Sequence, residues 1–511
     1  ASEMFQQVIA MKPKSKQASN AATRISDALA FRAEAKESKE DYAQALKDYV
    51  SLRDTAKAFE AQKGLGNKKF KKDMYDYYET ASAKVIETRF NGSSKGDADK
   101  LSAADAYLEF IIEFPKSKNA PVVLNIAAIY YFNTNEVKKS MESRHLMIEQ
   151  YSTSKYYLEH LAKLGFNYAA IANYRVAAEW YERLYKEAPD YTDGDGNTVA
   201  KEAIRRAGIF REKLGDWEQA VKNKKEFMKT YSDDPISIKM PIDIARIYQD
   251  NEQPKKAIKA YSDYYTNPPK GASKYDLFYA RQQHGLLLKQ QGQKKQLAKV
   301  WKRTLEAYTK YIKDKDKNKP SKEEIDAITK IIAEIKYDLA QPAANRYLNM
   351  KITGTTSTNV KKIQRILNKQ IKDKLETKKE VEKLYTEIAF ELEGGKWSLA
   401  ALVEIGKLYD NYAETIENSY VPSFFDEGQA ELYKMQLQDQ AYNYKQNGIK
   451  FYEKAIELAF EFSIYTEATE YAMDRLGKVL PDQYSAREED VIPPGYLSST
   501  QRTRSLIQTA E

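Results

Sequence analysis

The sequence of 511 residues contains no cysteine, few helix-breaking residues and only three histidines. The absence of cysteine excludes disulfide bonds, thiolate nucleophiles and cysteine-ligated zinc or iron–sulfur centres. The 20 glycines and 15 prolines make up about 7% of the chain, against roughly 12% in average usage. This scarcity argues against an all-β sandwich, a collagen-like chain or a low-complexity linker protein.

Signatures of membrane insertion and of common enzyme classes are also missing. No stretch of about 20 apolar residues occurs, so we expect no transmembrane segment. The chain carries no phosphate-binding loop, dinucleotide-binding glycine motif or nucleophile elbow. His145, His160 and His284 lack the spacing of a metal site, and we expect each to be a packed structural residue. We therefore predict a non-enzyme without a cofactor.

Charge and apolar content are both high. Apolar residues make up 42% and charged residues 31% of the chain, which suits a continuous core with a well-solvated surface. The formal charge is +8, and the 82 basic residues are interspersed with 74 acidic ones. Such mixing is typical of solvated helix faces, so we expect no nucleic-acid partner.

One segment is richer in positive charge than the rest. Lys361–Lys383 contains nine basic and four acidic residues. We expect an exposed helix face here. The alternative is a module that binds an anionic polymer or a membrane surface through this basic C-terminal helix.

The periodicity of apolar residues is helical almost throughout. Leu161, Leu164 and Tyr168 illustrate the three- and four-residue spacing, whereas strand-like alternation is essentially absent. Turn clusters interrupt the pattern at Pro189–Asn197 and Asn267–Gly271. The sequence therefore predicts a succession of helices joined by short turns.

The helical pattern repeats along the chain. In one unit, small residues would let two helices approach closely, bulky residues would fill the gaps beside them, and a proline would stop the second helix. These residues are Leu161, Leu164, Gly165 and Tyr168, then Ala177, Tyr181 and Leu184, then Pro189. They resemble the tetratricopeptide repeat. Related patterns start near residues 124, 204, 241 and 281.

The resemblance implies an all-α fold, a tetratricopeptide-repeat superhelix (α-solenoid) with an irregular helical C-terminal region. Antiparallel helix pairs of this kind stack around a concave groove that is lined by the first helix of each repeat. We expect protein partners in this groove. By their spacing from the repeat residues, the groove residues are Asn125, Ile129, Phe132, Asn133, Phe166, Arg205, Ile209, Arg246, Gln249, Gln282, Leu286 and Lys289.

Five regions follow from the pattern. The chain opens on a spacing, Phe5 and Val8 before Pro13–Lys16, that returns before Pro115–Lys118, so we expect a first repeat whose first helix lies upstream. Repeat-like residues return at Leu402–Tyr409 and again after a long insertion. The predicted regions are N-terminal helical repeats at 1–118, of which the first is truncated, the repeat array at 119–318, irregular helices at 319–395, C-terminal repeat-like helices at 396–483 and an extended tail at 484–511.

Several segments near the C-terminus resemble large envelope-associated repeat proteins of gliding and predatory deltaproteobacteria. The segments are Asn418–Pro422, Gln429–Tyr433, Phe451–Ala455 and Leu480–Tyr484. The resemblance implies a scaffold or adaptor that assembles a cell-envelope or motility complex, in the periplasm or associated with the envelope. A cytoplasmic location and an enzyme within residues 319–483 are the alternatives.

The turn after Pro189 is the one candidate metal site. Asp193, Asp195 and Glu202 match the carboxylate spacing of a calcium-binding helix–loop–helix. Tyr191 occupies the first ligand position, which removes a principal oxygen ligand. We therefore expect a solvated turn, with a weak calcium site as the alternative.

Overall fold

The computed structural model describes residues 2–91, 96–314, 320–355, 357, 359–392 and 394–484, which are almost entirely helical. Within these residues the β-structure consists of one isolated bridge between Thr192 and Thr198. The chain divides into two compact units, an N-terminal unit at Ala1–Glu252 and a C-terminal unit at Gln253–Glu511. The boundary between them falls inside the predicted array at 119–318, and the five predicted regions stay a prediction.

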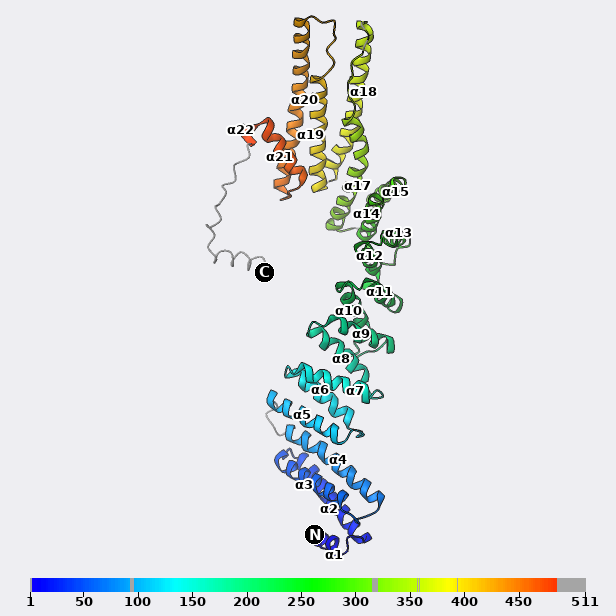
Figure 1. Cartoon of the computed structure of the whole chain (residues 1–511), viewed down its shortest axis with the longest axis vertical. Helices are drawn as coiled ribbons and strands as arrows, with labels where there is room; N and C mark the ends of the chain where they lie inside the picture. Colours follow the sequence, from blue (N-terminus) through cyan, green and yellow to red (C-terminus); the bar gives the residue numbers. More distant parts are fainter. Residues whose placement is uncertain are drawn as a thin grey trace. The chain divides into compact units, whose positions relative to one another are not determined.

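The N-terminal unit is a series of helices that follow one another in chain order (Figure 1). Each helix packs mainly against its neighbours in sequence. The helices are α1 (Ser2–Met11), α2 (Lys16–Glu37), α3 (Tyr42–Ala61), α4 (Lys68–Asn91), α5 (Asp97–Glu113), α6 (Ala120–Asn133), α7 (Val137–Gln150), α8 (Tyr157–Ala170), α9 (Tyr174–Glu187), α10 (Val199–Lys213), α11 (Trp217–Thr230) and α12 (Pro235–Asp250).

The turns inside the helix pairs share one backbone conformation, a residue with positive φ just after the first helix. Asn135, Ala172 and Gly215 each adopt a positive φ, of 63°, 59° and 77°, directly after a helix ends. The next amide then bonds back to the helix, as Asn173 N does to Tyr168 O at 2.9 Å. This geometry satisfies carbonyls that the helix end would leave unpaired. Because three different residue types adopt this conformation, it could not be predicted from the sequence pattern.

Small residues let the paired helices approach, as predicted. Gly165 of α8 is buried, and a Cβ at this position would lie 2.5 Å from Cε1 of Tyr181 in α9. Ala177, also in α9, is fully buried. A side chain at position 165 would therefore collide with the aromatic ring that fills the contact.

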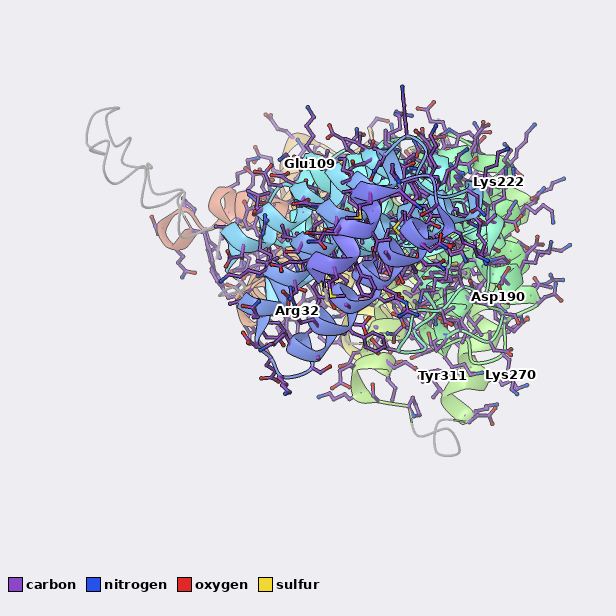
Figure 2. The ribbon with its side chains drawn as sticks, turned by 90° about the horizontal axis from the view of Figure 1, so that it is seen from below. Arg32, Glu109, Asp190, Lys222, Lys270 and Tyr311 are labelled. Carbon is purple, nitrogen blue, oxygen red and sulfur yellow. The ribbon has the colours of Figure 1, made fainter. Side chains whose placement is uncertain are left out.

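Charged residues occupy the solvent faces of the same helices. The side chains of Glu109 and Lys222 project outward from the ribbon (Figure 2). The charged residues, 31% of the chain, can therefore stay in solvent while the apolar side chains of the same helices are buried in the helix–helix contacts.

The C-terminal unit begins with further helix pairs and continues into longer helices. Its helices are α13 (Pro254–Thr266), α14 (Lys274–Gln290), α15 (Lys294–Lys313), α17 (Lys322–Leu348), α18 (Val360–Thr386), the π-helical turn η1 (Glu387–Glu391), α19 (Lys396–Glu417), α20 (Glu427–Glu461), α21 (Glu467–Val479) and α22 (Pro481–Tyr484).

Two close contacts repeat the packing of the N-terminal unit. A Cβ at Gly285 of α14 would run into the ring of Trp301 in α15. A Cβ at Gly406 of α19 would lie 2.5 Å from Cε1 of Tyr452 in α20. The second contact joins the two separated segments that resemble a repeat. The predicted all-α fold of helix pairs is therefore confirmed for the described residues.

The insertion expected between these two segments is largely helical. α20 begins at Glu427, more than 20 residues before Tyr452, and its N-terminal half buries Leu437 and Ala441 against the unit. Asn359 caps the start of α18, where its side chain accepts a hydrogen bond from Lys362 N. The expected tail beyond Tyr484 lies outside the described residues. No helix in the described part of the chain is long and apolar enough to cross a membrane.

Candidate protein-binding sites

A hollow of about 430 Å³ lies in the N-terminal unit on the side of the first helices. α8, α10, Tyr181 of α9 and the connection between α9 and α10 form its walls. The lining combines aromatic rings, four carboxylates and two cations. The residues are Glu159, Ala162, Lys163, Phe166, Tyr181, Tyr191, Asp193, Gly194, Asp195, Val199, Glu202, Ala203 and Arg206.

Two predicted groove residues meet beside this hollow. Phe132 of α6 and Phe166 of α8 contact each other edge to face, with ring centroids 5.7 Å apart. Phe166 is 43% exposed and also lines the hollow. This contact brings apolar side chains of α6 and α8 together. Ile129 is half-buried and Asn133 is exposed on α6.

Asn125 lies deeper than a groove residue would. Its side chain is 9% exposed, and its Oδ1 lies 2.9 Å from Nε2 of His160. Burial and the nearby Arg144 lower the pKa of His160 to about 3, so this imidazole is neutral at physiological pH. Asn125 therefore connects α6 to α8 inside the unit.

Intramolecular contacts already engage the polar groove residues of α10 and α12. Arg205 pairs with Glu202 at 2.7 Å, and Arg246 lies 3.3 Å from Asp243. Ile209 and Gln249 are half-buried. The arginines of the predicted surface are thus already in intramolecular ion pairs, and a partner would have to bind them beside the carboxylates that they contact.

The carboxylates of the candidate calcium turn do not converge. Asp193 accepts hydrogen bonds from the amides of Asp195 and Asn197, at 3.1 and 2.8 Å. Glu202 is held by two arginines, and its hydrogen bonds to Arg205 hold the pKa of the carboxyl below its usual range. Within the described ranges, no group of three or more histidine, aspartate or glutamate side chains could hold a metal ion. The solvated turn and the weak calcium site stay predictions.

The groove residues of α14 face another helix of the same unit. Gln282 donates to Glu334 of α17 at 2.5 Å, and Lys289 pairs with Asp338 of α17 at 2.5 Å. Leu286 is half-buried. α17 therefore packs beside α14, where the resemblance to tetratricopeptide repeats implied an open groove, and no sequence pattern predicted this contact.

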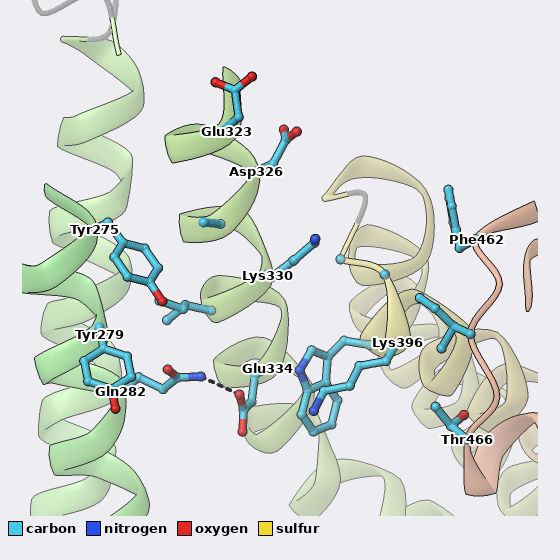
Figure 3. A pocket seen from close by; sticks show the side chains of 16 residues that line it. Tyr275, Tyr279, Gln282, Glu323, Asp326, Lys330, Glu334, Lys396, Phe462 and Thr466 are labelled. Atoms are coloured by element: carbon cyan, nitrogen blue, oxygen red, sulfur yellow. Dashed lines mark hydrogen bonds between the residues drawn. The ribbon is translucent and has the colours of Figure 1, made fainter. Parts of the chain in front are cut away.

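A larger cavity of about 980 Å³ lies in the C-terminal unit between α14, α17, the start of α19 and the connection that follows α20 (Figure 3). Tyr275 and Tyr279 form one wall, and their rings are stacked with centroids 6.2 Å apart. Gln282 and Glu334 meet across it (Figure 3). The cavity combines aromatic walls with charged groups.

A glycine turn shapes the opposite wall of this cavity. Gly395 has φ 59° and ψ −117°, a region that residues with a Cβ rarely adopt. Lys396 and Trp397 follow at once, and the Lys396 ammonium lies 5.1 Å from the centre of the Trp397 ring. η1 lies just before this turn. The sequence indicated a break at this point but not the cavity.

All three histidines lie in side-chain contacts. His145 Nε2 lies 3.0 Å from the hydroxyl of Tyr168, and His284 Nδ1 lies 2.8 Å from the hydroxyl of Tyr265. Burial lowers the pKa of both imidazoles. These contacts agree with the structural role predicted for them.

No protein-family model matches the chain. No curated protein matches it either. Solved structures similar to the chain include a tetratricopeptide repeat protein from Parabacteroides merdae, at 13% identity over 55% of this chain and 92% of that one, with a TM-score of 0.25. The Naa15/Naa10 complex bound to HypK-THB matches at 13% identity over 94% of this chain and 63% of that one, with a TM-score of 0.32.

Human IFIT1 in a dimer with m7Gppp-AAAA is similar at 11% identity over 79% of this chain and 82% of that one, with a TM-score of 0.20. The chain spans less than two thirds of the matched Naa15/Naa10 chain. These likenesses concern the helical fold alone. Helical repeat proteins, one of them a tetratricopeptide repeat protein, are therefore among the structural neighbours of this all-α chain.

Proposed function

We propose that the chain is a non-catalytic scaffold that binds a segment of a partner protein in a groove along the first helices of its repeats. The contact between Phe132 and Phe166 carries this proposal, because it joins two predicted groove residues from successive repeats beside a hollow. Phe166 leaves 43% of its surface exposed there. Exposed aromatic residues in a hollow are typical anchor points for protein partners.

The charges around the hollow suggest what the partner segment carries. Four carboxylates and two cations line it, and Glu202 is already neutralised by Arg205 and Arg206. The remaining acidic groups favour a segment with a basic residue near an apolar one. Such a segment would place its apolar side chain against Phe166.

The assembly that this scaffold serves is proposed to be a cell-envelope or motility complex, with the chain in the periplasm or associated with the envelope. Support comes from the resemblance of Asn418–Pro422, Gln429–Tyr433, Phe451–Ala455 and Leu480–Tyr484 to envelope-associated repeat proteins. The partner is then another protein of that compartment.

Site-specific photo-crosslinking in cells that naturally make the chain tests the proposal. A benzophenone amino acid replaces Phe166 in one variant and Ile171 in the control, which is 51% exposed and does not line the hollow. We expect a discrete adduct with an envelope protein from position 166 and none from position 171. Phe166→Asp should remove the partner from affinity-purified chain, whereas Ile171→Asp should retain it.

Equal crosslinking from both positions would contradict a binding site at the hollow. An adduct with a cytosolic protein alone would contradict the envelope assignment while leaving the scaffold role intact.

A further inference from the structure

The N-terminal half of α18 carries a one-sided stripe of positive charge. Five cations precede its first carboxylate, Asp373, and all five are exposed. At 3.6 residues per turn they fall within an arc of roughly 100°, opposite the buried Ile363 and Leu367. This basic stripe consists of Lys361, Lys362, Arg365, Lys369 and Lys372.

The stripe differs from the basic segment as a whole. Lys374 and Lys378, which also belong to the nine basic residues of Lys361–Lys383, are buried. Lys374 donates to Asn411 Oδ1 at 2.9 Å, and Lys378 pairs with Glu382 at 2.8 Å. These two lysines hold α18 to the unit, so the charge available to a partner lies in the stripe.

Four of the five cations of the stripe lack an acidic partner among the described residues. Lys372 lies 3.8 Å from Glu376, whereas the other four form no ion pair with a described residue. Lys361 and Lys362 lie in the first turn, which contains no acidic residue, and cations there oppose the helix dipole. Lys361 with Arg365 and Arg365 with Lys369 are like charges four residues apart, a spacing that destabilises a helix. An anionic partner would relieve both penalties.

Contacts between the helices fix which end of the bundle the stripe occupies. Lys374 of α18 bonds to Asn411 of α19, and Tyr412 packs on Tyr444 of α20 with ring centroids 4.6 Å apart. Lys374 of α18 and Tyr444 of α20 therefore lie at the same height along α19, because they contact the adjacent residues Asn411 and Tyr412. Both helices begin beyond this level at the same end of the unit (Figure 1).

Large apolar side chains are exposed at that end. Lys361 precedes Lys374 by 13 residues and Leu432 precedes Tyr444 by 12, so each lies about 20 Å beyond the shared level. Leu432 and Met435 are 60% and 61% exposed, and Val360 at the start of α18 is 54% exposed. Unpaired cations and uncovered apolar side chains thus occur together at one end of the bundle.

We propose that this end of the C-terminal unit binds a membrane surface rich in anionic phospholipids. The basic stripe would contact the phosphate and carboxylate groups of the lipid heads. Leu432, Met435 and Val360 would enter the interfacial region, where apolar side chains gain from burial. A soluble anionic polymer would engage the charges but leave these apolar residues exposed, and for this reason a membrane is the better fit.

Flotation of the full chain with vesicles tests the proposal. The vesicles contain phosphatidylcholine with about one third phosphatidylserine, and pure phosphatidylcholine vesicles give the background. We expect binding to the anionic vesicles that falls by roughly tenfold or more when Lys361, Lys362, Arg365 and Lys369 are all changed to Gln. Changing Leu432 and Met435 to Ser should weaken binding without altering the net charge.

α15 supplies a matched control in the same unit. It exposes the four lysines Lys294, Lys295, Lys299 and Lys302 but no large apolar side chain. Changing these four to Gln removes the same charge and should leave vesicle binding within about twofold. Far-UV circular dichroism checks that each variant retains its helices.

Three outcomes would overturn the proposal. The first is equal binding to anionic and neutral vesicles, and the second is an equal loss in the α15 and α18 variants, which would indicate attraction to net charge alone. The third is tight binding to heparin with none to vesicles, which would assign the stripe to a polymer.

Discussion

Gly165 is the residue at which the packing of a helix pair is most sensitive. A Cβ there would lie 2.5 Å from Cε1 of Tyr181, a residue that is itself only 5% exposed. Gly208 occupies the matching place in the next pair, yet a Cβ there would meet Asn223 and Lys224 at an ordinary 3.6 Å. The two glycines therefore differ in what surrounds them, although the sequence treats them alike.

We expect Gly165→Ala to lower the free energy of unfolding by about 1–3 kcal/mol, because the ring of Tyr181 must shift. Gly208→Ala should instead change it by less than about 1 kcal/mol, in the stabilising direction, because alanine favours the helix. Urea unfolding followed by far-UV circular dichroism measures both. Equal losses in the two variants would contradict the close contact at Gly165.

At the scale of the element, the interface of α6, α7 and α8 contains a polar group that must stay uncharged. His160 of α8 is fully buried with Arg144 of α7 nearby, and its pKa of about 3 lies well below the usual 6.5. The unfolded chain therefore takes up a proton between pH 6.5 and 3 that the folded chain does not. Stability linked to His160 is complete above pH 6.5 and declines as the pH falls below it.

We predict that lowering the pH from 7 to 5 destabilises the protein by about 2 kcal/mol more than it destabilises His160→Gln. Urea unfolding of both proteins at the two pH values gives this difference. An NMR titration of His160 in the unmodified protein provides a second readout, and a ring that titrates near pH 6.5 would refute the prediction.

The helices themselves could be predicted from the sequence, whereas contacts between distant helices could not. The small and bulky residues around Gly165 and Tyr181 recur at fixed spacing, so local periodicity was sufficient to predict the pair. The packing of α17 on α14 depends on single polar contacts such as Gln282 with Glu334, which leave no periodic trace. Where we expected an open groove along α14, the structure has a cavity that α14 and α17 line together.

α20 illustrates the same limit in another form. The sequence predicts repeat-like residues only after a long insertion, whereas α20 (Glu427–Glu461) joins part of that insertion and the repeat-like residues in one helix. The N-terminal half of α20 buries little besides Leu437 and Ala441, so its amphipathic pattern is weak. The exposed end that we assign to a membrane surface combines the starts of α18 and α20, two helices that are far apart in the sequence but begin at the same end of the unit (Figure 1).

At the scale of the whole molecule, the N-terminal unit behaves as a stack in which each helix contacts mainly its neighbours. Stability in such an architecture is approximately a sum over adjacent pairs. The function that we propose depends on the same adjacency, because a partner segment could follow the surface only if first helices of successive repeats lie side by side. Phe132 of α6 and Phe166 of α8 contact each other where these two first helices meet.

Crosslinking of an engineered cysteine pair tests this adjacency directly, since the chain has no cysteine of its own. We predict that Phe132→Cys combined with Phe166→Cys gives a rapid intramolecular crosslink with a short bis-maleimide under native conditions. Phe31→Cys combined with Phe166→Cys places the second thiol on α2, which is not adjacent to α8, and should give none. Failure of the 132/166 pair to crosslink, or equal crosslinking of both pairs, would contradict the shared surface on which the proposed scaffold function depends.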